Sequence, residues 1–175
     1  MSPQPDTVVF TLARNFAAPL DRVWAAWTRP ELLARWYGPK GAETTILGAD
    51  LRPGGLLHGR METPGVAGAG FRFRFLYREI VPPSVEGQAR LAWIQSFADE
   101  AGEIAPSPFG EPWPRRLLTE VTFREAADGR STHVDLIWSP LDATGDEQAA
   151  FAAETTSMTG GWTGSFARLD AALAE

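Results

Sequence analysis

The chain has 175 residues, a formal net charge of −6 and no cysteine. This length fits one domain with a sizeable core, the lack of cysteine excludes disulfides and thiolate metal sites, and the acidic balance argues against nucleic acid or an anionic membrane as the main partner. Seven residues are tryptophan. Because tryptophan is large and its N–H requires a partner when buried, this content indicates a large aromatic core, an apolar cavity, or both.

The N-terminal part of the chain predicts a strand followed by two short helices. Residues 7–15 alternate apolar and polar side chains, as a half-buried strand does. A helix is expected to begin at Pro19, because proline suits the first helical turn, and to end before Pro30. A second short helix is expected to run from Pro30 to the break at Gly38.

Strand periodicity replaces helical periodicity in the middle of the chain. The clearest case is residues 71–80, where Phe71, Phe73 and Phe75 alternate with other side chains, mostly arginine. Turns rich in proline and glycine separate the segments, which predicts antiparallel neighbours. Strands are expected at residues 42–51, 56–62, 71–80, 89–97, 117–124 and 132–138.

The C-terminal part of the chain predicts one long helix that opens near Asp146. Gly160, Gly161 and Gly164 each lower its helix propensity by about 1 kcal/mol, so they mark a bend or a close approach of another backbone. Residues that recur every three or four positions form one continuous apolar stripe along a face of this helix. The stripe runs through Phe151, Thr155, Met158, Trp162, Phe166, Leu169 and Leu173.

These elements predict one α+β domain over residues 1–175, with a curved antiparallel sheet of six to seven strands around the long C-terminal helix. No run of about 18 apolar residues is present, as a membrane-spanning helix would require. Residues 1–6 lack the basic start and the apolar stretch of a signal peptide. We therefore expect a soluble, cytoplasmic protein.

Several motifs carry a resemblance to a known family. Residues 17–33 (AAPLDRVWAAWTRPELL) resemble the opening of START-like domains, also called SRPBCC or helix-grip domains. More narrowly, they resemble the family named for activators of the heat-shock chaperone ATPase (AHSA). The similarity extends over nearly the whole chain, with further blocks WYGP at 36–39, DLRPGG at 50–55, SPFGEPWP at 107–114, VTF at 121–123 and GGW at 160–162. These motifs specify the fold and leave the activity open, because the superfamily hosts many functions.

The resemblance implies the helix-grip fold, with two short helices after the first strand and a cavity between the concave sheet and the long helix. Pockets of this kind are mostly apolar with a few placed polar groups. Gln95 is the polar group expected in this cavity, because it shares a strand face with Trp93 and Phe97. Part of the candidate set is expected only to pack in the core. The predicted ligand-binding residues are Trp27, Trp36, Met61, Phe73, Phe75, Trp93, Gln95, Phe97, Val121, Leu136, Met158, Trp162 and Phe166.

Few residues could carry chemistry in such a cavity. His58 and His133 are the two histidines of the chain. His58 is expected to face outward, opposite Met61, although a slip of one residue in strand 56–62 would bring His58 and Arg60 into the cavity. Two histidines on separate strands do not make a metal site. We therefore predict no catalytic residue, no metal and no cofactor.

Three functions remain open on these grounds. The leading hypothesis is a protein that binds a small hydrophobic or aromatic molecule. A polyketide-cyclase- or dehydratase-like enzyme is the first alternative, and it needs an acid or base that points inward, for which His58, Gln95 and Glu43 are the candidates.

The second alternative is an interaction protein that resembles the activators of the chaperone ATPase. In the eukaryotic co-chaperones the resemblance concerns the C-terminal domain. We expect the 175 residues to form one domain, without the additional N-terminal domain that does most of the chaperone binding, and this expectation weighs against a chaperone partner. A homodimer is a further alternative. Trp113 of the proline-rich loop either forms the contact between the two subunits or covers the mouth of the cavity.

Overall fold

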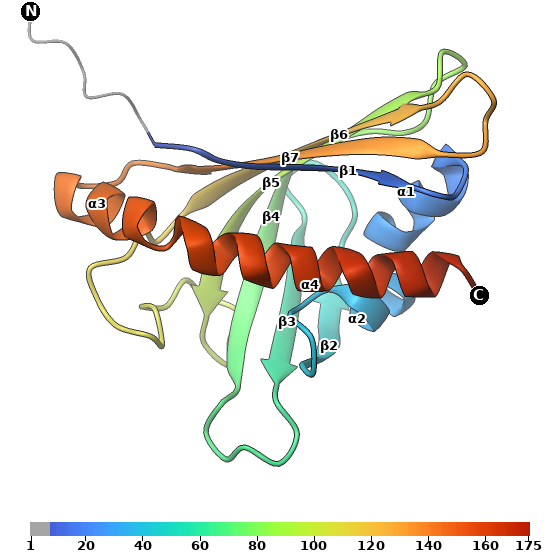
Figure 1. Ribbon diagram of the computed structural model, residues 1–175. Helices are drawn as coiled ribbons and strands as arrows, with labels where there is room; N and C mark the ends of the chain where they lie inside the picture. Colours follow the sequence, from blue (N-terminus) through green and yellow to red (C-terminus); the bar gives the residue numbers. More distant parts are fainter. Residues whose placement is uncertain (1–7) are drawn as a thin grey trace, which may run out of the picture.

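Alternating side chains build one curved sheet of seven antiparallel strands in the computed structural model, which describes residues 8–175 (Figure 1). The strand order is β1-β7-β6-β5-β4-β3-β2. The strands are β1 (Phe10–Phe16), β2 (Glu43–Ala49), β3 (Leu56–Glu62), β4 (Phe71–Val81), β5 (Gln88–Ala98), β6 (Leu117–Glu125) and β7 (Thr132–Pro140). The predicted α+β helix-grip fold is confirmed. The predicted strand start at Thr7 and the segment 1–6 lie outside the described residues.

Two short helices, α1 (Leu20–Thr28) and α2 (Pro30–Trp36), connect the two edge strands β1 and β2. Glu125 at the end of β6 fixes the start of α1, because its Oε2 accepts a hydrogen bond of 2.6 Å from the backbone N–H of Leu20. A carboxylate at this position also complements the positive end of the helix dipole. Pro30 begins α2 as expected, since its missing N–H is one that a first helical turn leaves unpaired.

The expectation of a single C-terminal helix is wrong. The segment forms two helices, α3 (Gly145–Ala153) and α4 (Thr155–Leu173), which meet at Glu154. The backbone of Glu154 leaves helical geometry (φ −100°, ψ 8°), and its N–H bonds to the carbonyl of Phe151, which closes the last turn of α3 tightly. Two β-branched threonines follow the break, where helix propensity is low. Thr144 and Glu147 cap the start of α3 with reciprocal hydrogen bonds.

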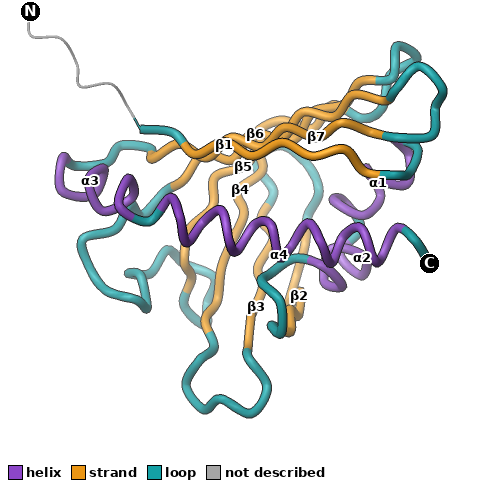
Figure 2. Tube along the Cα trace, in the orientation of Figure 1, coloured by secondary structure: helices purple, strands orange, loops and turns teal. Residues whose placement is uncertain are grey.

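The glycines of α4 do not break the helix, and Gly164 allows another backbone to approach. A Cβ atom at Gly164 would lie 3.4 Å from the backbone nitrogen of Lys40, whereas Gly160 and Gly161 face open space. Helix α4 runs across the concave side of the sheet, and the loop between β3 and β4 extends beyond the sheet end (Figure 2). No helix among the described residues is long and apolar enough to cross a membrane.

Trp27 lies at the centre of the core, between the short helices, the sheet and α4. Its ring centroid lies 4.7 Å from that of Trp36, 5.7 Å from Phe123 and 6.1 Å from Phe166. Such edge-to-face pairs stabilise a core beyond the area that they bury. Through Trp27, aromatic side chains of the short helices, the sheet and α4 are therefore in contact with one another.

Candidate functional site

A cavity of about 190 Å³ lies between the concave side of the sheet and α4. The strands β3, β4, β5 and β7 supply one wall, α4 supplies another, and the segment that follows α2 supplies the third. Aromatic residues are the largest group in its lining, and two methionines, Met61 and Met158, have flexible side chains that suit an adaptable binding surface. This composition matches that of small-molecule pockets.

The structure divides the thirteen predicted ligand-binding residues into two groups. The residues that line the cavity are Met61, Phe73, Gln95, Phe97, Met158 and Trp162. The residues that pack elsewhere in the core are Trp27, Trp36, Phe75, Trp93, Val121, Leu136 and Phe166. Phe75 illustrates the second group, because it shares a strand face with Phe73 and yet stacks on Trp93 with ring centroids 4.6 Å apart. Any contact between these residues and a ligand stays a prediction.

Sequence reasoning missed seven lining residues, which are Tyr37, Gly38, Pro39, Phe71, Trp138, Gly161 and Ser165. Phe71 and Trp138 continue alternations that the sequence already displays, so the same strand pattern could have found them. Tyr37, Gly38 and Pro39 follow the end of α2, where no periodicity predicts a side-chain direction. Gly161 and Ser165 are four residues apart on α4 and therefore share one helix face.

Strand register explains how the sheet makes room for the aromatic wall. Phe73 of β4 lies opposite Gly59 of β3 on one side and Phe97 of β5 on the other. A Cβ atom at Gly59 would lie 2.4 Å from the Phe73 ring, so the absence of a side chain at Gly59 is what lets this ring lie flat over β3.

One polar group stands out in the lining. Gln95 is half-buried in the middle of β5, and its Oε1 accepts hydrogen bonds from the Tyr37 hydroxyl at 2.9 Å and from the Trp93 indole N–H at 3.4 Å. Burial raises the pKa of Tyr37 well above its ordinary value. Tyr37 therefore stays a protonated phenol that donates to Gln95.

Helix α4 holds the segment after α2 by its backbone. Ser165 accepts a hydrogen bond of 3.2 Å from the N–H of Gly38 through its Oγ, which also donates to the carbonyl of Gly161 at 3.1 Å. Arg168 donates to the carbonyl of Gly38 at 3.0 Å. These contacts fix one wall of the cavity to another, so the position of Tyr37 depends on α4 as well as on α2.

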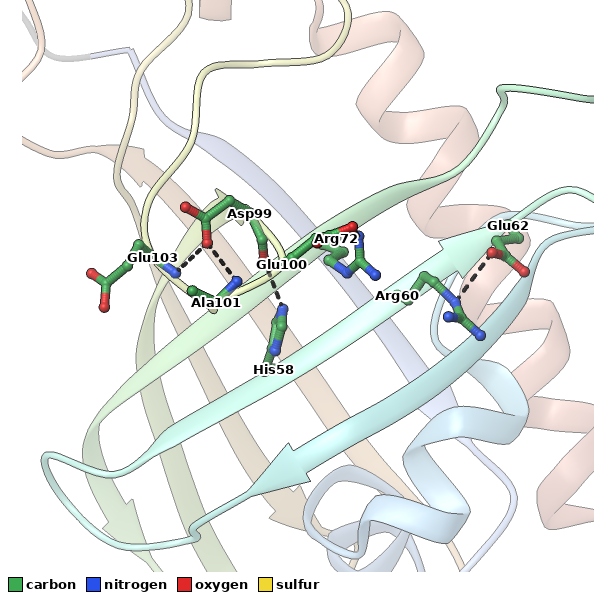
Figure 3. Close-up of polar contacts among 8 residues, drawn as sticks. All are labelled: His58, Arg60, Glu62, Arg72, Asp99, Glu100, Ala101 and Glu103. Carbon is green, nitrogen blue, oxygen red and sulfur yellow. Dashed lines mark hydrogen bonds and ion pairs between the residues drawn. The ribbon is translucent and has the colours of Figure 1, made fainter.

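The histidines lie on the opposite, outer face of the sheet, as expected. In β3, Leu57, Gly59 and Met61 are buried and the residues between them are not, so the predicted register is confirmed. The ring Nε2 of His58 lies 3.2 Å from the carbonyl oxygen of Asp99, and Arg60 pairs with Glu62 at 3.1 Å (Figure 3).

His133 contacts Asn15 and Asp135 on the same outer face of the sheet, at 2.7 and 3.2 Å. Within residues 8–175, no three histidine, aspartate or glutamate side chains gather as a metal site would require.

The proline-rich loop borders the cavity. Phe109 is 76% exposed, and its ring centroid lies 5.6 Å from that of Phe71 and 5.9 Å from that of Phe97, both of which line the cavity. Trp113 lies 5.9 Å from Phe151 of α3 and lines a smaller adjoining space of about 60 Å³. These contacts of Phe109 and Trp113 hold the proline-rich loop (residues 103–114) against the body of the domain.

Fold and cavity together define a START-like domain of the helix-grip type. The chain belongs to the family described as Activator of Hsp90 ATPase homolog 1-like protein, whose family model matches residues 17–174. The match covers most of the chain, which confirms the resemblance seen in the sequence motifs. A comparison with curated proteins gives no match.

Solved structures share this fold at low sequence identity. Protein Ms6760 from Mycobacterium smegmatis is 23% identical with a TM-score of 0.73, and the alignment covers 96% of this chain and 91% of that one. A protein from Arthrobacter aurescens is 27% identical with a TM-score of 0.72, over 97% and 87% of the two chains. DynU16, a protein of the dynemicin biosynthetic locus, is 20% identical with a TM-score of 0.58, over 97% of this chain and 48% of DynU16.

Proposed function

We propose that this protein binds a small apolar or aromatic molecule in the cavity between the sheet and α4. One observation carries the proposal, namely a cavity of about 190 Å³ that is lined mostly by aromatic and methionine side chains with very few polar groups. Apolar side chains that line an unfilled space lack dispersion contacts on that side. A ligand would restore those contacts.

The chemistry of the lining favours binding over catalysis. Among the described residues that line the cavity, Tyr37 is the one titratable side chain. Because burial raises its pKa, Tyr37 holds its proton through the neutral range and cannot serve as a general base there. Of the three candidates for a cyclase-like enzyme, His58 and Glu43 do not line the cavity. The third, Gln95, does line it, but its side-chain amide carries no titratable proton for general acid or base chemistry.

The proposal assigns a small molecule, and not a chaperone or a second copy of the chain, as the partner. Trp113, the residue considered for a dimer contact, is half-buried against α3. Stimulation of a chaperone ATPase by the purified protein, at concentrations where no ligand is bound, would favour the interaction function instead.

Gly161 gives the sharpest test of the proposed binding. It lines the cavity, and a Cβ atom there meets open space, so leucine at this position fills the cavity from α4. Gly160, one residue earlier in the same helix, also faces open space but does not line the cavity. Gly160→Leu is therefore a matched control for the change in helix propensity.

The experiment measures tryptophan quenching by a panel of small aromatic and lipid-like molecules, with native mass spectrometry of the purified protein. Gly161→Leu should weaken binding roughly tenfold or more, because added methylenes in an occupied cavity must be accommodated, and Gly160→Leu should bind like the wild type. Saturable binding that Gly161→Leu leaves unchanged would place the ligand elsewhere and contradict the proposal.

A further inference from the structure

The amide of Gln95 has a defined orientation. Its contact with Trp93 is decisive, because an indole N–H can only donate a hydrogen bond. The Gln95 atom 3.4 Å from the Trp93 Nε1 must therefore be the carbonyl Oε1, which also accepts from the Tyr37 hydroxyl at 2.9 Å. Two donors use both lone pairs of this oxygen, so the protein satisfies the acceptor side of the amide completely.

The nitrogen side of the same amide is left with two donors. Within residues 8–175, the Gln95 Nε2 has no acceptor at hydrogen-bond distance. The nitrogen is not fully buried either, so part of its surface stays accessible. Gln95 lines both the main cavity and the adjoining space of about 60 Å³. Its N–H groups are therefore available to a molecule in this region.

Two further polar side chains of the lining already have hydrogen-bond partners in the protein. The Oγ of Ser165 already accepts from Gly38 and donates to Gly161. Trp138 donates its indole N–H to Thr119 at 2.7 Å. The Tyr37 hydroxyl donates to Gln95, and its oxygen keeps free lone pairs, so the lining offers an acceptor as well as the donors of Gln95. No lysine, arginine or histidine of the described chain lines the cavity to attract a full negative charge.

We infer that the cavity selects a neutral, largely apolar molecule that carries a hydrogen-bond acceptor, such as the carbonyl oxygen of a ketone, ester or lactone, and that the Gln95 Nε2 donates to this oxygen. This inference rests on the proposed function. A ligand that lacks an acceptor leaves the two donors of Gln95 unpaired in a confined space, and an unpaired donor lowers affinity.

Two probes that differ in one group test this inference. 1-Tetralone and tetralin share a two-ring skeleton, and only the ketone carries an acceptor. In a titration followed by nuclear magnetic resonance, the wild type should bind the ketone roughly threefold to tenfold more tightly, the range expected for one neutral hydrogen bond. The side-chain amide signals of Gln95 should shift with the ketone and not with the hydrocarbon.

Gln95→Met removes both donors and keeps a side chain of similar length. It should abolish the preference for the ketone, whereas Gln88→Met, the same substitution at the exposed start of β5, should retain it. The comparison of probes in the wild type needs no variant, so the test stands even where Gln95→Met does not fold.

The outcomes separate this inference from the function on which it rests. Equal affinities for the two probes would overturn the selection for an acceptor and would leave the binding function supported. A preference for the ketone that persists in Gln95→Met would overturn the role of Gln95. No saturable binding of either probe would overturn both proposals.

Discussion

The hydroxyl of Tyr37 donates a hydrogen bond of 2.9 Å to the Oε1 of Gln95 and so connects the end of α2 to the middle of β5. The two residues are 58 positions apart in the chain. Because Oε1 also accepts from Trp93, this contact fixes the amide of Gln95 in one orientation. The polar character of the cavity therefore depends on a residue that lies outside every helix and strand.

Tyr37→Phe should lower the free energy of unfolding by about 1 kcal/mol, the usual contribution of a buried hydrogen bond. Tyr77 provides the control, since it is equally buried and its hydroxyl has no hydrogen-bond partner within residues 8–175. Tyr77→Phe should change stability by less than about 0.5 kcal/mol. Urea unfolding of the two variants measures the difference, and equal losses would show that the Tyr37 contact adds nothing.

Stability should depend on the ionisation of the two tyrosines at high pH. Burial raises the pKa of both Tyr37 and Tyr77 in the folded state, whereas an unfolded chain ionises tyrosine near pH 10. Below about pH 10 both states hold the proton, and the contribution to stability is fully present. Above it the unfolded state loses the proton first, so stability falls by up to about 1.4 kcal/mol per pH unit for each tyrosine.

The measurement is straightforward because the chain contains only two tyrosines. Tyrosinate absorbance in the folded protein should stay low until well above pH 10, and the decline in stability should be shallower in Tyr37→Phe. Ionisation of both tyrosines near pH 10 with the fold intact would contradict this account.

Gly59→Ala should destabilise the protein and also reduce ligand binding. Its Cβ atom would lie 2.4 Å from the Phe73 ring, so that ring must move toward the cavity that it lines. Overpacking of this kind costs about 1–3 kcal/mol. Gly48→Ala on the neighbouring strand meets nothing within 4 Å and should leave stability and binding unchanged. Thermal unfolding with a ligand titration tests the pair, and similar effects of the two changes would refute the prediction.

Gly164 should tolerate no large side chain, unlike Gly160. Its Cβ position is already 3.4 Å from the backbone of Lys40, so Gly164→Leu should separate α4 from this segment and lower stability by about 1–3 kcal/mol. Gly160→Leu has open space and should raise stability by up to about 1 kcal/mol through helix propensity. Denaturant unfolding measures the stability of both variants. A Gly164→Leu protein as stable as the wild type would show that the close approach of the Lys40 backbone to α4 does not contribute to stability.

Much of the fold could be predicted because strand alternation depends only on which side chains leave water. The register of β3 illustrates this, since Met61 inside and His58 outside follow from one alternating pattern. The break at Glu154 could not be predicted in the same way, because the stripe that includes Phe151 and Met158 continues across it. Tertiary packing of α3 and α4 decides the geometry there, and local periodicity does not record it.

The candidate site was harder to predict than the fold. Periodicity assigns a residue to a face of the sheet, but it does not say whether that face meets another side chain or a cavity. Phe73 and Phe75 share one face of β4, and only Phe73 lines the cavity. Tyr37 follows the end of α2, where the direction of a side chain depends on the backbone contacts with Ser165 and Arg168.

Phe109→Ala should accelerate ligand exchange while changing stability little. The ring is largely exposed and packs on Phe71 and Phe97, which line the cavity, so it covers these two residues from the side of the loop. Loss of exposed aromatic pairs should cost about 1 kcal/mol or less. Association and dissociation should both become faster, with a smaller change in affinity, because the ring limits access more than it holds the ligand.

Stopped-flow tryptophan fluorescence can follow this exchange, because Trp138 and Trp162 line the cavity. Val85→Ala removes another exposed apolar side chain, far from these aromatic contacts, and serves as the control. If the rates of Phe109→Ala match those of the wild type, the ligand does not pass the proline-rich loop. The β3–β4 loop, which lines a second pocket together with Phe71, would then be the entrance to test.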